Sequence, residues 1–231
     1  MASKQAFALH ISQQDYDDTI TNRYKLLPLY EAEERVLVAI FAGYPQFDFA
    51  ELMTRVTLLN QFYSTAISDI RSVVNHILEI SNVEERLVAG DISVVDEIAK
   101  VSHRGKMWHH NSFASKFANF HNPNAFPIMD RLVLDLFCRL RRKGFFHINT
   151  KFSHDGLRRN YPKYVEVYRE FIKLSGMGNL TRSGRSLNYK DVDNYLWASL
   201  KISSLDANST LAQTAPTAYA QVTNNAINQI P

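Results

Sequence analysis

The sequence contains little cysteine and no long hydrophobic run. Cys138 is the single cysteine, so no internal disulfide can form, and its place in an apolar run predicts that it packs as a small hydrophobic residue. No stretch approaches the roughly 18 apolar residues that a membrane span requires, and the N-terminus has no convincing signal-peptide core. We therefore expect a cytoplasmic protein without a membrane partner.

Several motifs of cofactor and metal chemistry are also absent. The chain has no glycine-rich phosphate loop of the Walker or Rossmann type, no Cys-x-x-Cys pair and no His-Glu-x-x-His segment. His109 and His110 are adjacent, so on a helix they point in different directions, and neither has an obvious third ligand nearby in the sequence. We expect neither a metal nor another cofactor.

Apolar residues and an uneven charge distribution are present instead. Apolar residues make up 45% of the 231 positions, which is enough to fill a substantial core. Residues 1–100 hold 8 Lys and Arg against 15 Asp and Glu, a balance of −7, whereas residues 101–201 hold 18 against 7, a balance of +11. A basic region of this kind is typical of nucleic-acid binders, although solvated helix faces are often basic without function.

Helical periodicity dominates the chain and no alternating strand pattern of useful length is visible. The fold class is therefore all-α, with about ten helices. From residue 203 the composition turns to Ala, Thr, Asn, Gln and Ser, which predicts a disordered tail over 203–231. Eight helices are expected over Asp15–Leu27, Glu31–Tyr44, Asp48–Phe62, Ile67–Ile80, Asp91–Val101, Ser112–Phe120, Tyr161–Ser175 and Tyr189–Ile202. Two more are expected to begin at Asn82 and Asp130.

The segment from Ser112 to Val133 carries the most informative pattern. A helix ends at the His-Asn-Pro-Asn group, and Pro127 fixes the backbone shortly before Asp130. An apolar run follows at once, so Asp130 lies where the next helix begins. The simplest role for this carboxylate is an N-cap, and a catalytic role is compatible with it.

This segment resembles the helix-hairpin-helix (HhH-GPD) DNA glycosylases, which include endonuclease III and the adenine glycosylases. Phe126–Asp130, Phe-Pro-Ile-Met-Asp, is similar to the segment that delivers the catalytic aspartate in that family. Ser112 lies eighteen residues earlier, where bifunctional members carry a lysine nucleophile and adenine glycosylases carry serine. The resemblance thus implies a monofunctional enzyme, and Lys116, one helical turn beyond Ser112, is a competing nucleophile.

The resemblance covers roughly residues 50–135 and implies a fold of two lobes with a cleft, lobe A from 1–46 plus 131–202 and lobe B from 47–130. One departure concerns the glycine-bearing hairpin of the family, which falls here at Lys106–His110 and has lost both glycines. The implied roles are gap filling by Asn60 and Gln61, a base pocket with Phe62, Tyr63 and Trp108, and DNA phosphate contacts by Arg104, Lys106, His109 and Arg131.

The function implied is that of a monomeric DNA glycosylase on double-stranded DNA. Such an enzyme flips a damaged or modified base out of the duplex and hydrolyses its N-glycosidic bond, leaving an abasic site. Asp130 would stabilise the positive charge that develops on the sugar and orient or deprotonate the attacking water. Repair is one setting, and defence against phage DNA with modified bases, such as glucosylated hydroxymethylcytosine, is another. A non-catalytic helical DNA- or RNA-binding protein and a helical protein-interaction module remain open alternatives.

Overall fold

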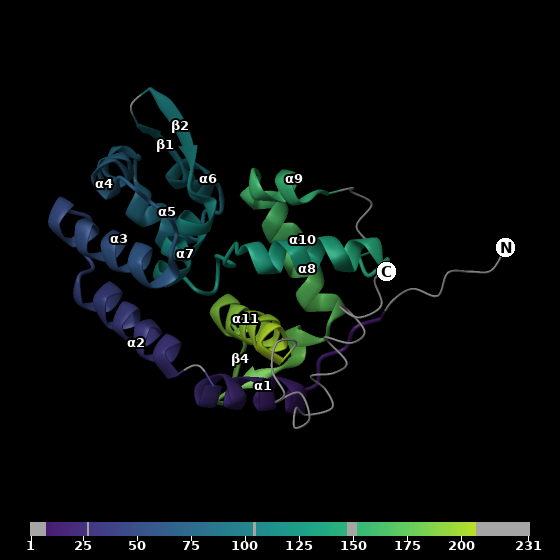
Figure 1. Cartoon of the computed structure of the whole chain (residues 1–231). Helices are drawn as coiled ribbons and strands as arrows, with labels where there is room; N and C mark the ends of the chain where they lie inside the picture. Colours follow the sequence, from purple (N-terminus) through teal and green to yellow (C-terminus); the bar gives the residue numbers. More distant parts are fainter. Residues whose placement is uncertain (1–7, 27, 104, 147–151, 207–231) are drawn as a thin grey trace.

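The computed structural model describes residues 8–26, 28–103, 105–146 and 152–206. Over these ranges the fold is almost entirely helical, as the periodicity predicts, and two short β-hairpins were not predicted. Figure 1 shows one group of helices from α2 to α7 and another that includes α8 to α11. The helices are α1 (Gln13–Leu26), α2 (Pro28–Gly43), α3 (Phe49–Tyr63), α4 (Ile70–Glu79), α5 (Val83–Ala89), α6 (Ser93–Ala99), α7 (Asn111–His121), α8 (Arg131–Arg142), α9 (His154–Arg158), α10 (Tyr161–Leu174) and α11 (Tyr189–Asp206), with a 3-10 turn, η1 (Met177–Asn179).

The first hairpin joins β1 (Lys100–His103) to β2 (Lys106–His109). Its strands are antiparallel, with Val101 opposite Trp108, and Gly105 takes a φ of +71° in the turn. This hairpin includes the segment to which the glycosylase resemblance assigns the family's glycine-bearing hairpin, and the described residues there form antiparallel strands. The helix predicted over Asp91–Val101 ends at Ala99, because Lys100 and Val101 pair with β2 instead.

The second hairpin pairs β3 (Thr181–Arg182) with β4 (Arg185–Ser186), in a stretch expected to be loop. At the other boundary, α11 runs to Asp206, so the predicted start of the tail at residue 203 is four residues too early. The remainder of that predicted tail, residues 207–231, lies outside the described residues. Pro28 opens α2, where its missing N–H costs nothing.

Helix α7 lies at the centre of the fold and is buried over most of its surface. Phe113, Ala114, Phe117 and Ala118 are fully inaccessible to solvent and pack into one continuous core. Helices α2, α3 and α6 contact α7, while α1 and α8 contact α11. A polar side chain on α7 is therefore held in an apolar environment, which bears directly on Lys116.

Candidate active site

The loop before α8 is held by side chains from two buried helices. Hydrogen bonds fix four consecutive backbone positions of this loop, so the residue that follows them has little positional freedom. The bonds are Asn119 Nδ2 to the Phe126 carbonyl at 2.7 Å, Tyr161 Oη to the Pro127 carbonyl at 2.7 Å, Tyr164 Oη to the Ile128 carbonyl at 2.5 Å, and the Met129 N–H to Ser115 Oγ at 2.9 Å.

Asp130 follows this fixed loop as the N-cap of α8. Its Oδ1 accepts a hydrogen bond from the Leu132 N–H at 2.7 Å, so the predicted capping role is confirmed. The side chain remains 26% exposed, and the exposed part faces a cavity. One carboxylate oxygen is therefore used by the helix while the other is available for chemistry.

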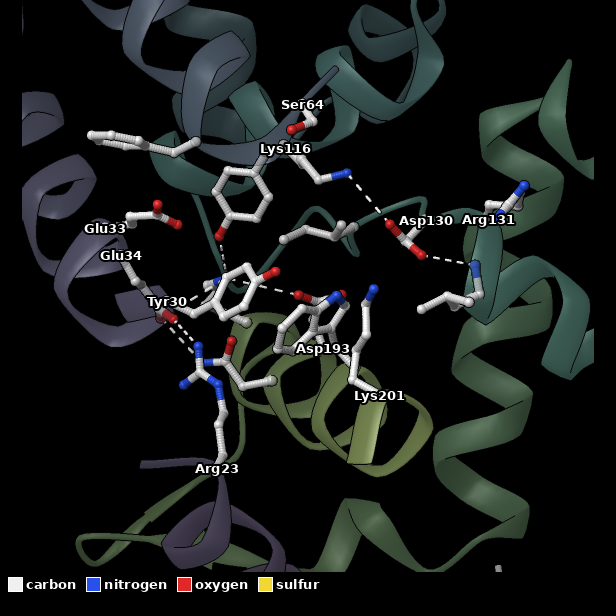
Figure 2. Close-up of a pocket in the computed structure, with 17 residues that line it drawn as sticks. Arg23, Tyr30, Glu33, Glu34, Ser64, Lys116, Asp130, Arg131, Asp193 and Lys201 are labelled. Atoms are coloured by element: carbon white, nitrogen blue, oxygen red, sulfur yellow. Dashed lines mark hydrogen bonds and ion pairs between the residues drawn. The ribbon is translucent and has the colours of Figure 1, made fainter. Parts of the chain in front are cut away.

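Lys116 of α7 lies beside this second oxygen. Its Nζ is 3.8 Å from Asp130 Oδ2 and donates a 2.6 Å hydrogen bond to Ser112 Oγ. Figure 2 shows the amine pointing toward the carboxylate. Burial lowers the pKa of Lys116 below its ordinary value, and the nearby negative charge of Asp130 only partly opposes that effect. The three predicted catalytic residues, Ser112, Lys116 and Asp130, are thus brought together.

The cavity in front of this pair has a volume of about 320 Å³. This falls in the range of roughly 300–1,000 Å³ that is usual for small-molecule sites. Residues of both helix groups line it, and four aromatic rings give it flat apolar walls (Figure 2). The rings are Tyr30 of α2, Phe62 and Tyr63 of α3, and Trp197 of α11.

A second cluster of charged side chains, Lys190, Glu34 and Asp193, lines the same cavity. This cluster was not found from the sequence. Lys190 Nζ donates a 2.8 Å hydrogen bond to Tyr63 Oη and lies 3.9 Å from Glu34 Oε1 and 3.7 Å from Asp193 Oδ2. Burial raises the pKa of Asp193 to about 6, with Lys190 acting in the opposite direction. Burial also disfavours ionised Glu34, but the charges of Lys190 and Arg23 outweigh it and hold the pKa of Glu34 below its ordinary value.

A smaller basic pocket adjoins the cavity. It has a volume of about 240 Å³, and Arg131 lines both hollows. Within the described residues this pocket has no acidic side chain in its wall. Its remaining cationic or imidazole side chains are His109, His110, His154 and Arg158. An anion such as a phosphate suits this wall.

A strained turn separates the two hollows. Ser64 lines the cavity and Thr65 lines the basic pocket, while Ser64 and Ala66 take positive φ values of 47° and 59°. The Asn60 amide holds this turn: it donates to the Ile67 carbonyl and accepts from the Thr65 hydroxyl and the Ile67 N–H. Such strain persists only where the surroundings impose it, often at functional sites. The structure therefore uses Asn60 as a brace for the turn.

The other predicted site residues fall in three places. Gln61 is exposed on α3, next to the turn. Trp108 is 41% exposed on β2 and lies outside the wall of the cavity, with Lys106 Nζ 4.4 Å from its ring centroid. Its ring stacks on that of His110, the N-cap of α7, and the structure does not bring it to the cavity with Phe62 and Tyr63. Arg104 lies outside the described residues.

One cluster resembles a hydrolase triad without its geometry. Ser72 Oγ and Asp69 Oδ2 both approach His103 Nδ1, at 3.0 and 2.9 Å. A working triad needs the carboxylate on one ring nitrogen and the nucleophile on the other. Asp69 also caps α4 by accepting from the Ser72 N–H. This cluster therefore stabilises the start of a helix.

Two features are absent from the described ranges. Those residues contain no group of three or more His, Cys, Asp and Glu side chains placed to hold a metal ion. None of the described helices combines the length and apolarity needed to cross a bilayer.

Over the described residues, the fold and the cavity define a mostly helical protein with a paired lysine and aspartate facing an open, aromatic-lined site. Residues 7–125, just over half of the chain, match the family HI_0787_N, N-terminal domain, and the chain belongs to that family. A protein of Haemophilus influenzae described as uncharacterized is 34% identical over 146 residues, which cover 63% of this chain and 64% of the relative. The chain thus spans just under two thirds of the length of that relative. No solved structure matches this chain.

The family match ends before the second half of the candidate site. Residues 7–125 include Tyr63 and Lys116, whereas Asp130, Lys190 and Asp193 follow the matched region. The cavity is therefore built jointly by the family domain and by the helices that come after it.

Proposed function

We propose that this protein is a DNA glycosylase that uses Lys116 as an amine nucleophile and Asp130 as the carboxylate that assists it. The observation that carries the proposal is the 3.8 Å approach of these two groups in front of an open cavity. A buried amine with a lowered pKa is neutral more often than an exposed one, and only a neutral amine is nucleophilic. Ser112 then accepts a hydrogen bond from the amine and orients it.

The reaction follows from these positions. As the N-glycosidic bond breaks, its electron pair leaves with the base, which takes up a proton from water, and Asp130 stabilises the positive charge on the sugar. The Lys116 amine bonds to C1′ and passes a proton to Asp130. Asp130 returns this proton to O4′ as the sugar ring opens, which gives a protonated imine between Lys116 and C1′. Water then removes a proton from C2′, and β-elimination breaks the C3′–O bond and releases the 3′ phosphate. This proposal departs from the monofunctional enzyme expected from Ser112, because it adds strand cleavage to base removal.

The surroundings of the pair support a nucleic acid as substrate. An extruded base needs a flat apolar slot, which the four aromatic rings supply. The sugar would lie at the Lys116–Asp130 pair, and the adjoining phosphate would meet the basic pocket, where Arg131 and Arg158 lie. The same three subsites would be unnecessary in a protein that only binds other proteins.

Borohydride trapping of the imine tests the proposal. Duplexes with single oxidised, alkylated, deaminated or glucosylated hydroxymethylcytosine residues are incubated with the protein, and abasic sites are revealed by alkali. We expect a covalent cross-link with wild-type protein and none with Lys116→Gln. Asp130→Asn should bind DNA normally but lose at least roughly 100-fold in rate. Asp17→Asn, an exposed change on α1 that lines neither hollow, is the matched control.

The outcomes separate the candidate functions. Absence of a cross-link and of abasic sites from every duplex, including one with a preformed abasic site, would remove the enzyme and leave a binding protein. Excision without a cross-link would restore the water-dependent, monofunctional reaction. Activity confined to the glucosylated base would place the enzyme in phage defence, and activity on damaged bases would place it in repair.

A further inference from the structure

Asp193 is a charged group in the cavity wall to which the proposed reaction gives no task. It lies on α11 and is only 5% exposed, yet it faces the cavity that Lys116 and Asp130 also line (Figure 2). The carboxylates of Glu34 and Asp191 accept hydrogen bonds from arginine side chains. Asp193 differs from both.

Among the residues that the structure describes, none donates a hydrogen bond to the Asp193 carboxylate. Its nearest cation is Lys190 Nζ at 3.7 Å, beyond hydrogen-bond distance, and Lys190 already donates to Tyr63. A buried carboxylate normally accepts several hydrogen bonds, since its desolvation is costly otherwise. An occupant of the cavity that brings N–H donors would therefore complete this site.

The rings around Asp193 restrict the shape of that occupant. Trp197 lies one helical turn further along α11, and its ring meets that of Tyr30 edge to face, with centroids 4.6 Å apart. Tyr63 and Phe62 supply aromatic surface from α3. The occupant is thus a flat ring system with donors on the edge that reaches Asp193.

We propose that Asp193 selects guanine-type bases by accepting hydrogen bonds from the N1–H and the exocyclic amino group of the flipped base. This inference rests on the proposed glycosylase function and names its substrate class. Guanine presents these two donors side by side, and a carboxylate offers two oxygens in a matching arrangement. Uracil and thymine lack the exocyclic amino group, so they satisfy at most one oxygen.

A pair of substrates that differ by one amino group tests the selection directly. Duplexes carry 8-oxoguanine or N7-methylguanine at one position, and matched duplexes carry the corresponding base without the 2-amino group. We expect wild-type protein to excise at least one guanine form roughly 10- to 100-fold faster than its counterpart, as a two-point contact allows. Asp193→Asn should reduce that ratio to near one by slowing excision of the guanine form.

Two controls separate recognition from folding and from the reaction itself. Asp191→Asn makes the same change at a buried position of α11 outside this cavity, so its ratio should stay at the wild-type value. Cleavage of a preformed abasic site needs Lys116 but no base, so Asp193→Asn should still cleave and trap it. Because the Asp193 charge raises the pKa of Lys116, the pH profile of this cleavage should move to lower pH in the variant.

The remaining results contradict either the role of Asp193 alone or the proposed glycosylase function as a whole. Cleavage and trapping at a preformed abasic site, combined with equal excision of both members of each pair, would overturn the role of Asp193 and leave the glycosylase standing. A preference for uracil, or an unchanged ratio in Asp193→Asn, would overturn it equally. Failure to react with any duplex or abasic site would instead remove the proposed function, and this inference with it.

Discussion

Replacing Asp193 by asparagine should make the protein more stable at pH 8. Burial raises the pKa of this carboxyl from its ordinary value of 3.8 to about 6, so the ionised form is disfavoured in the folded protein. A shift of about two units corresponds to about 3 kcal/mol of differential stabilisation between the two protonation states. Asparagine has nearly the same shape and carries no charge.

The sign of the pH dependence follows from proton binding. Between pH 6 and pH 4 the folded wild-type protein holds a proton on Asp193 that the unfolded chain has released, so this residue opposes folding above pH 6 and ceases to do so below pH 4. Four other charged side chains act on Asp193, namely Lys190, Lys116, Asp130 and Glu34. They are present in both proteins, so their own titration largely cancels in the comparison.

The measurement is a pair of thermal melts by circular dichroism at pH 8 and pH 4.5. The raised pKa already includes the attraction to Lys190, so we expect a gain of about 3 kcal/mol at pH 8. For a chain of this size that corresponds to a rise of about 6–12 °C in melting temperature. The gain should shrink to about 1 kcal/mol at pH 4.5. Two results would contradict the idea that the ionised Asp193 carboxylate destabilises the fold: a variant less stable than wild type at pH 8, or a gain in stability that does not change with pH.

Three further changes have defined outcomes. Tyr164→Phe removes the hydrogen bond to the loop that precedes Asp130, so it should lower stability by about 1–3 kcal/mol and, on the proposed mechanism, reduce kcat more than KM. Tyr168→Phe removes a buried hydroxyl with no partner among the described residues and should cost nothing in either melts or kinetics. Gly90→Ala places a Cβ 2.8 Å from another side chain at φ +74°, so its melting temperature should fall further than that of Gly105→Ala, where a similar φ meets open space. Arg158→Ala should reduce the slope of log affinity for DNA against log salt by about one without changing which base is excised; an unchanged slope would place the DNA backbone elsewhere.

The position of Asp130 could be predicted because the information is local. Pro127, a loop and an immediate apolar run define a helix start within a few residues, and the structure confirms both the helix and the cap. The hairpin from Lys100 to His109 was missed because its strands are only four residues long. A pattern of that length is too short for alternation to stand out from the helices on either side.

The second charged cluster, Lys190, Glu34 and Asp193, could not be located from a local sequence pattern. Glu34 and Asp193 lie on helices that are far apart in the sequence, and only the packing of α2 near α11 brings them to one cavity. A partial signal was available: Lys190, Asp193 and Trp197 recur at helical spacing beside the apolar positions of α11. Charged residues within a predicted buried face indicate a site, although they do not identify the helix that completes it.

Arg131 belongs to the walls of the aromatic cavity and of the basic pocket at the same time. A substitution there changes two compartments in one step, so neither can be optimised alone at this position. A change that suits a new occupant of one compartment must therefore also be acceptable to the occupant of its neighbour.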